Sequence, residues 1–221
     1  RDAAAEGEPR FVLHGSSGLK ANVYRARLAD DRVQLTTASG AKFTWPLDDI
    51  YLADFSAGKI QYLSDLEPAS QSATPLIALP PGAAVAAKYA APRRDQSANG
   101  GPLTLASAGD SLTSPIDATQ TFNKGLAIRS RTELVYRLPA GYRRLNAIAG
   151  IDPATRASGN VRLEIFGDDR PLLAADVVGI DRPRTIDLDI TDVKRLKFVV
   201  DYGQNLDTGD WLNLCDLRIV K

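Results

Sequence analysis

A short polar segment near the C-terminus places one aromatic residue among acids and amides. The sequence NLDTGDWLN (residues 205–213) contains Asp207, Asp210, Trp211 and Asn213. A pyranose ring has an apolar C–H face and a rim of hydroxyls, which an aromatic ring and fixed polar groups match together. The segment therefore predicts a sugar site with Trp211 as the stacking platform. Burial of the indole in a β-sandwich core is the alternative.

A pair of arginines forms the second candidate group. Arg129 and Arg131 flank Ser130, so they share one face of an expected strand. A guanidinium can fork to two hydroxyls or to a carboxylate. A solvated strand face, or an ion pair with Glu133, is the alternative. We predict a carbohydrate-binding set made of Trp211, Asp210, Asn213, Arg129 and Arg131.

The sequence gives little support for catalysis. A glycosidase needs two carboxylates that face each other across the scissile bond, and 27 acidic residues single out no pair. The sole histidine, His14, stands beside Gly15 at the end of an expected strand, and a structural position there is the simpler interpretation. Cys215 lies in a strand-like run and is expected to be a small buried side chain. We therefore predict a protein that is not an enzyme.

No cofactor is required by this residue set. A single cysteine excludes an intrachain disulfide and a multi-thiolate metal cage. Calcium needs six to eight oxygen ligands, many of them backbone carbonyls that leave no trace in a sequence. Aspartate-rich turns at 168–169, 187–192 and 207–210 supply carboxylates without EF-hand spacing. A structural calcium ion is therefore the only metal that we keep as an expectation.

The hydrophobic pattern predicts an all-β protein. Val161, Leu163 and Ile165 alternate with polar residues, and the runs at 134–138 and 186–190 do the same. Successive side chains of a strand face opposite sides, so each run has one dry and one wet face. The one stretch that could form a helix, 83–91, is short and lies between prolines, so we expect a loop or an extended crossing.

Two blocks follow a frayed tail at residues 1–8. Residues 9–57 should form a small SH3- or Sm-like β-barrel, with Trp45 in its core. Its expected strands are 10–14, 19–28, 32–37, 41–45 and 49–55. Its basic residues Lys20, Arg25, Arg27 and Arg32 are offset by five aspartates, so nucleic-acid binding is not expected. Residues 58–221 have the length and the eight or nine strands of a two-sheet β-sandwich.

The composition of the chain restricts the class of protein and its expected cellular location. The chain has 27 basic and 27 acidic residues and is 44% hydrophobic, which is typical of a globular protein. No apolar run approaches the roughly 18–20 residues of a membrane span. The chain does not begin with Met. The economical interpretation is that a leader was removed, and we expect a secreted or periplasmic protein.

Several motifs of the second block together resemble one family. They are YLSDLEP (62–68), ATP (73–75), NGGPLTL (99–105), NKGLAIRSRTELVYRLPAGYRRLNAIAGID (123–152), GNVRLEIFGDDRPLL (159–173) and RLKFVVDYGQNLDTGDWLNLCDLRI (195–219). In order and spacing this set is similar to the NPCBM family of carbohydrate-binding modules. The small β-domain that leads into it (47–68) resembles proteins of planctomycete-type bacteria.

The resemblance implies a galactose-binding-like jelly roll, a sugar-binding role often beside a glycosidase, and in some members a structural calcium ion. We therefore expect a non-catalytic module that holds a glycan, with a galactose-type sugar as one option and a glycosidase or envelope protein as a partner. Family members often have His where this chain has Arg129, and aromatic content is only 7%. Both observations favour an alternative, an envelope or extracellular protein-interaction scaffold without sugar affinity.

Overall fold

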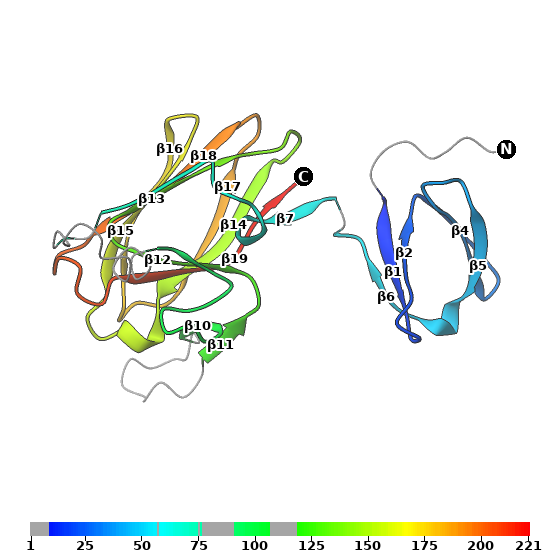
Figure 1. Cartoon of the computed structure of the whole chain (residues 1–221), viewed down its shortest axis with the longest axis horizontal. Helices are drawn as coiled ribbons and strands as arrows, with labels where there is room; N and C mark the ends of the chain where they lie inside the picture. The colour runs from blue at the N-terminus through cyan, green and yellow to red at the C-terminus, as the bar shows by residue number, and fades with distance from the viewer. Residues whose placement is uncertain (1–8, 57, 75, 77–90, 107–118) are drawn as a thin grey trace, which may run out of the picture. The chain divides into compact units, whose positions relative to one another are not determined.

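The computed structural model describes residues 9–56, 58–74, 76, 91–106 and 119–221 (Figure 1). Contacts divide the chain into two units, residues 1–60 and 61–221, and each unit is described by itself. The frayed tail expected at 1–8 and most of the loop expected at 83–91 (residues 83–90) lie outside the described residues.

The first unit consists of two three-stranded antiparallel sheets. Its elements are β1 (Phe11–Gly15), β2 (Lys20–Val23), β3 (Arg25–Ala29), β4 (Arg32–Thr36), β5 (Lys42–Pro46), a 3-10 turn η1 (Leu47–Asp49) and β6 (Ile50–Asp54). The strand orders are β2-β1-β6 and β3-β4-β5. The single strand expected at 19–28 is wrong, because the chain passes from one sheet to the other at Tyr24. Val23 pairs with Phe11, whereas Arg25 pairs with Thr36.

Trp45 fills the core of this unit, as the sequence predicts. The indole is 7% exposed and packs with Leu13 and Leu35. The chain passes so close to it at Gly15 that an added Cβ would lie 2.3 Å from Trp45 Cζ2. A larger residue at position 15 would therefore displace the central side chain of a small core.

The second unit contains the remaining strands and two further 3-10 turns. They are β7 (Ile60–Tyr62), η2 (Leu63–Asp65), β8 (Ser70–Ala73), β9 (Arg93–Arg94), β10 (Leu103–Ala106), β11 (Thr119–Phe122), β12 (Gly125–Arg129), β13 (Thr132–Arg137), β14 (Arg144–Ile151), η3 (Pro153–Thr155), β15 (Asn160–Gly167), β16 (Arg170–Val178), β17 (Arg184–Asp189), β18 (Arg195–Tyr202) and β19 (Trp211–Val220). The described residues contain no α-helix, which confirms the all-β prediction.

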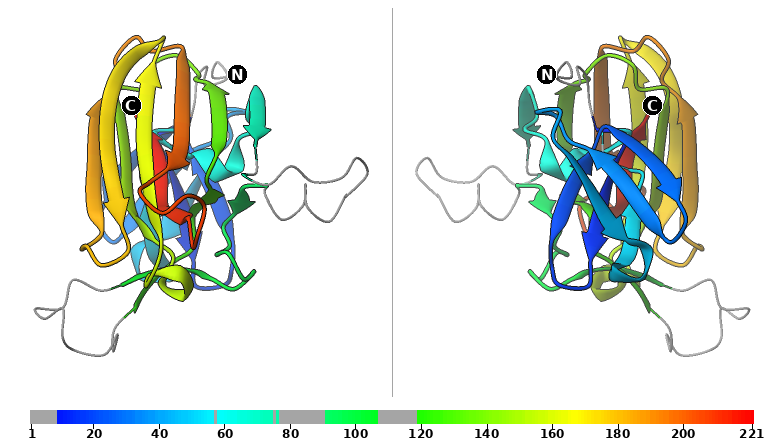
Figure 2. Two further views of the ribbon diagram at one scale, coloured as in Figure 1. Left: turned by 90° about the vertical axis from the view of Figure 1, so that its left-hand side faces the viewer. Right: turned by 90° about the vertical axis from the view of Figure 1, so that its right-hand side faces the viewer.

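Two sheets form the sandwich of this unit (Figures 1 and 2). One sheet has the order β17-β14-β19-β12-β9, with β7 also paired to β19, and the other has the order β16-β15-β18-β13-β8. A separate hairpin is formed by β10 and β11. The alternating residues of β15 bury Val161, Leu163 and Ile165 as the pattern predicts. Tyr136 and Phe198 meet edge-to-face in the core, with ring centroids 6.2 Å apart.

Strand β12 and the first half of β19, residues 211–215, are buried on both faces. Their second face belongs to a smaller core cluster of Leu103, Leu105, Ala127, Trp211 and Cys215, to which β10 contributes. Burial raises the pKa of the Cys215 thiol to about 12, so the reactive thiolate does not form near neutral pH. The prediction of a small buried side chain at Cys215 is confirmed.

Gly125, in the NKGLAI motif, permits the pairing of these two strands. Its φ is +147°, and an added Cβ would lie 2.3 Å from the Leu214 carbonyl oxygen. We expect Gly125→Ala to lower the free energy of unfolding of the sandwich by about 2–4 kcal/mol, because strain adds to a clash with backbone. Urea unfolding measures this change. An exposed glycine with open space around it, Gly141, provides the matched control, because Gly141→Ala adds only strain. Equal losses in the two variants would contradict the packing argument.

Candidate functional site

Strand pairing brings three segments distant in sequence to one end of the sandwich. Arg129 pairs with Trp211, Thr132 pairs with Val200, and Val161 pairs with Tyr202. Segments 129–132, 152–160 and 201–211 therefore lie together, and we name this region the loop end. All five residues of the predicted binding set stand at the loop end or within two residues of it.

Charged and aromatic side chains gather at the loop end around Tyr202. The Arg129 guanidinium lies 3.2 Å from Asp207 Oδ2, and Arg131 Nε lies 3.7 Å from Asp201 Oδ2. The Tyr202 hydroxyl donates a hydrogen bond to the Thr74 carbonyl oxygen at 3.0 Å. We name Arg129, Arg131, Asp201, Tyr202 and Asp207 the Tyr202 cluster. The acidic partners of the two arginines are thus Asp201, near the end of β18, and Asp207, in the β18–β19 connection, rather than Glu133.

The members of the Tyr202 cluster remain accessible to solvent. The side chain of Arg131 is 52% exposed and that of Asp201 is 37% exposed. The phenol is half-buried. Burial, followed by the negative charges of Asp207 and Asp201, raises the pKa of Tyr202 above its ordinary value and outweighs the two arginines. The cluster therefore presents guanidinium donors, carboxylate acceptors and part of an aromatic ring on one surface.

Asp210 supports this surface from inside. It is fully buried, and its carboxylate accepts hydrogen bonds from Ser130 Oγ at 2.7 Å and from the Asn160 backbone N–H at 3.0 Å. Burial raises the pKa of Asp210 despite these two bonds. Through these two bonds, the Asp210 carboxylate connects the turn at Ser130, which carries Arg129 and Arg131, with the start of β15. In this conformation Asp210 therefore fixes loops rather than facing solvent.

Asn213 and Trp211 are also interior residues. Asn213 Nδ2 donates to the Thr104 carbonyl oxygen at 3.0 Å and to Asp152 Oδ2 at 3.2 Å. The indole of Trp211 is 5% exposed, and the Arg93 guanidinium carbon lies 5.6 Å from its ring centroid. The geometry favours the alternative of core packing for Trp211. Direct ligand contact stays a prediction, and exposure favours Arg129 and Arg131 for that role.

Tyr202 and Asp201 are members of the cluster that sequence reasoning missed. Their position depends on the register of β18 against β13, which pairs Thr132 with Val200. That register places the two residues after Val200 beside the turn that carries Arg131. A single sequence holds no sign of this pairing, because the two strands are separated by more than 50 residues.

Carboxylates of two of the expected aspartate-rich turns accept backbone hydrogen bonds. Asp189 accepts the N–H of Thr191 within its own turn, the ordinary use of aspartate in turns. Asp168 accepts the N–H groups of Lys194 and Arg195 and so connects its turn to the start of β18. Within the described parts of the chain, no group of three or more His, Cys, Asp or Glu residues could hold a metal ion. A structural calcium ion therefore stays a prediction that would rest on carbonyl ligands.

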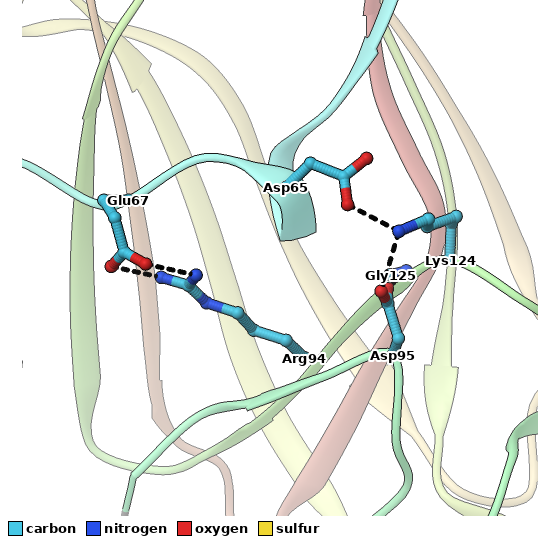
Figure 3. Close-up of polar contacts among 6 residues, drawn as sticks. All are labelled: Asp65, Glu67, Arg94, Asp95, Lys124 and Gly125. Carbon is cyan, nitrogen blue, oxygen red and sulfur yellow. Dashed lines mark hydrogen bonds and ion pairs between the residues drawn. The ribbon is translucent and has the colours of Figure 1, made fainter.

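A network of ion pairs at the other end of β12 connects two of the family-like motifs, 62–68 and 123–152, with the segment at β9 (Figure 3). Lys124 Nζ lies between Asp65 and Asp95, at 2.5 Å and 2.9 Å from their carboxylate oxygens. Asp95 also accepts the Gly125 backbone N–H, and Arg94 forks onto Glu67 with two bonds of 2.7 Å. The network ties η2 and the segment at β9 to the start of β12.

Asp95 should contribute stability that depends on pH. Burial opposes its ionisation, but hydrogen bonds that include those from Lys124 and Gly125 outweigh it and lower the pKa. The stabilisation by Asp95 is therefore fully present above the pKa that its carboxyl has in the unfolded chain. It is lost as pH falls through the lower pKa that the carboxyl has in the folded protein. We expect Asp95→Asn to cost about 1 kcal/mol at neutral pH and less on acidification, measured by urea unfolding at several pH values. A loss that stays constant with pH would contradict this assignment.

In the described part of the chain, no helix has the length and apolar character needed to cross a membrane.

Comparison with known proteins identifies related sequences and folds. The NPCBM/NEW2 domain matches residues 59–220. The CBM51 module of Clostridium perfringens GH95, solved in complex with methyl-galactose, superimposes with a TM-score of 0.60 and 20% identity, covering 73% of this chain and 99% of that one. No curated protein gives a significant match.

Two further solved structures share the fold. One contains the CBM51-2 module, with GlcNAc bound, and the INT domains of Clostridium perfringens ZmpB; its TM-score is 0.60 at 18% identity, covering 95% of this chain and 43% of that one. The tandem CBM51 modules of Sp3GH98, a family 98 glycoside hydrolase from Streptococcus pneumoniae, give a TM-score of 0.58 at 17% identity, covering 73% and 47%. At these identities the likeness establishes the β-sandwich fold.

Proposed function

The chain belongs to the NPCBM/NEW2 domain family over residues 59–220, and we propose that its sandwich is a non-catalytic carbohydrate-binding module whose loop end holds a glycan. The observation that carries the proposal is the Tyr202 cluster, which places two arginines, two aspartates and a half-buried phenol on one accessible surface. Of the predicted interior residues, Asp210 would support that surface through its bond to Ser130, which stands between the two arginines.

The chemistry of the cluster suits a sugar. Guanidinium groups donate paired hydrogen bonds, carboxylates accept from hydroxyls, and the exposed part of a phenol can cover an apolar C–H face. Arg129 and Arg131 are each held by an aspartate, so they enter binding in a fixed geometry and lose less entropy. Galactose-type sugars and GlcNAc are the first probes, because structures of the same fold were solved with methyl-galactose and with GlcNAc.

The proposed biological role is to keep a glycan close to a partner. Structural neighbours are modules of larger proteins, and one of these proteins is a glycoside hydrolase. A glycosidase or an envelope protein is therefore the proposed partner. We also propose a secreted or periplasmic location in a bacterium, where such glycans occur, and a structural calcium ion outside the Tyr202 cluster.

A glycan array probed with the full chain, with calcium and then with EDTA, tests the function. The proposal predicts binding to galactose- or GlcNAc-containing glycans. If folded protein binds no glycan under either condition, sugar binding is excluded and the protein-interaction scaffold becomes the better account. Loss of thermal stability in EDTA would support the calcium ion, and an unchanged transition would exclude it.

Arg131→Ala is expected to weaken binding of the best array ligand about tenfold, because the variant removes a guanidinium from the accessible surface. Isothermal titration measures the affinity. Arg137→Ala is the matched control, since Arg137 is an exposed arginine at the far end of β13, the strand that begins directly after Arg131. Equal affinities of the two variants would move the site away from the Tyr202 cluster.

A further inference from the structure

Basic side chains collect on the outer face of the sheet β3-β4-β5 in the first unit. Cross-strand pairs share a face, and the register pairs Arg25 with Thr36 and Thr36 with Lys42. Two residues further along the strands, and therefore on the same face, Arg27 pairs with Gln34, which pairs with Thr44. Arg32 pairs with Ala29, again on this face. We name Arg25, Arg27, Arg32 and Lys42 the basic face. All four are exposed.

The opposite face of this sheet points into the core. Leu35 and Trp45 alternate with the exposed residues and are 1% and 7% exposed. The basic face is therefore the side of the sheet that looks away from the core of its own unit. A shallow hollow of about 280 Å³ lies on it, with Arg25, Arg27 and Lys42 among the residues that line it.

The acidic residues of the first unit lie outside the basic face. Asp30 and Asp31 occupy the β3–β4 turn beside Arg32, Asp48 and Asp49 lie in η1, and Asp54 ends β6. No acidic residue occupies an outward position of β3, β4 or β5. Across the described residues, no ion pair involves Arg25 or Arg27. The offset of charges expected from the sequence holds for the unit's total charge but not for this face.

We propose that the basic face binds an acidic polysaccharide that carries carboxylates, such as a polyuronate. Alternate residues on a strand are about 6.6 Å apart, so Arg25 and Arg27 form a row that suits a repeating anionic polymer. Each guanidinium can fork onto a planar carboxylate, and Gln34, Thr36 and Thr44 between the cations can bond hydroxyls.

The composition of the face favours a polysaccharide over a nucleic acid. Single-stranded nucleic acids are bound by aromatic platforms as well as by cations. The aromatic residues of these strands, Phe43 and Trp45, alternate with the outward residues Lys42 and Thr44. Trp45 is buried, and Phe43 is the one aromatic among the described residues that line the hollow, so the basic face has no row of aromatic platforms for successive bases. The overall charge balance of the chain also gives no extended basic footprint for a duplex.

Binding of polygalacturonate to the full chain at low and at physiological ionic strength tests the proposal. The wild-type chain should bind, and added salt should weaken binding. The variant Arg25→Gln/Arg27→Gln should bind about tenfold more weakly, because two charge-assisted contacts are lost. The control Arg10→Gln/Lys20→Gln removes the same charge from exposed positions outside the basic face and should bind as the wild type does.

Fluorescence of the buried Trp45, recorded in a Trp211→Phe background so that the second tryptophan does not contribute, verifies that the first unit is folded in every variant. Equal weakening in the two double variants would overturn the proposal, as would failure of the wild type to bind. Dextran sulfate and an oligothymidylate serve as competitors. If neither competitor displaces polygalacturonate, or does so only at a much higher concentration, the carboxylate assignment is supported. If either competitor binds in preference to polygalacturonate, the assignment is overturned. Binding of galactose-type sugars by the sandwich is measured separately, so the two proposals can fail independently.

Discussion

Trp211→Ala is expected to lower the free energy of unfolding of the sandwich unit by about 3–5 kcal/mol, the usual cost of truncating a buried tryptophan. The indole is 5% exposed and packs in the small cluster between β10 and the pair β12–β19. Truncation would leave a cavity beside Leu103 and Leu105 and would remove the ring that lies near Arg93. Hydrogen–deuterium exchange of the β12 and β19 amides measures the loss in the sandwich itself.

Trp211→Phe provides the matched control, because a smaller ring still fills much of the space and should cost only about 1–2 kcal/mol. A loss below about 1 kcal/mol in Trp211→Ala would mean that the ring contributes little to packing. The indole would then be available as the sugar platform that the sequence segment 205–213 suggests.

Asp210→Ala is expected to cost about 2–4 kcal/mol at neutral pH. The change leaves the Ser130 hydroxyl and the Asn160 backbone N–H without their acceptor in a buried site, and each lost partner costs about 1–3 kcal/mol. Asp210→Asn should retain most of the stability, because its amide oxygen can still accept from Asn160 and its nitrogen can donate to Ser130. Urea unfolding compares the two variants, and equal losses would contradict the bonding scheme.

Asp210 also has an effect on pH dependence opposite in sign to that of Asp95. Because burial raises its pKa, the native state binds this proton more tightly than the unfolded chain does. Its contribution to stability therefore falls as pH rises from the unfolded value, about 3.9, through the higher folded value. Relative to Asp210→Asn, the wild type should gain stability on acidification across that range. A difference that is independent of pH would contradict the raised pKa.

The sequence alone could predict most of the fold. Alternation located strands such as β13 and β15, because in a sheet packed on one side every second residue must be buried. The division at Tyr24 was missed because both halves of 19–28 have strand composition and only tertiary pairing separates them. The packing of β10 on a second face of β19 could not be predicted from the sequence, because the first half of β19, which is buried on both faces, has no alternation.

The candidate site could be located from the sequence but not resolved into its parts. The segment 205–213 and the pair Arg129–Arg131 do meet at one end of the sandwich. The residue at which β19 begins decides which side chains of this segment face solvent. Because β19 begins at Trp211, the side chains of Trp211 and Asn213 are buried. Tyr202 became part of the surface through the β13–β18 register, and segregation of Arg25 and Arg27 from the aspartates required the β3–β4 pairing.

The most direct test of the account is a nuclear magnetic resonance titration of the isotopically labelled full chain with methyl-galactoside and with GlcNAc. The account predicts that at least one sugar shifts the amide resonances of Arg129, Arg131, Tyr202 and Asp207, while resonances around Lys124 and Arg137 stay in place. Saturable shifts confined to residues away from the loop end, or no shifts with either sugar at concentrations that saturate the array ligand, would contradict it.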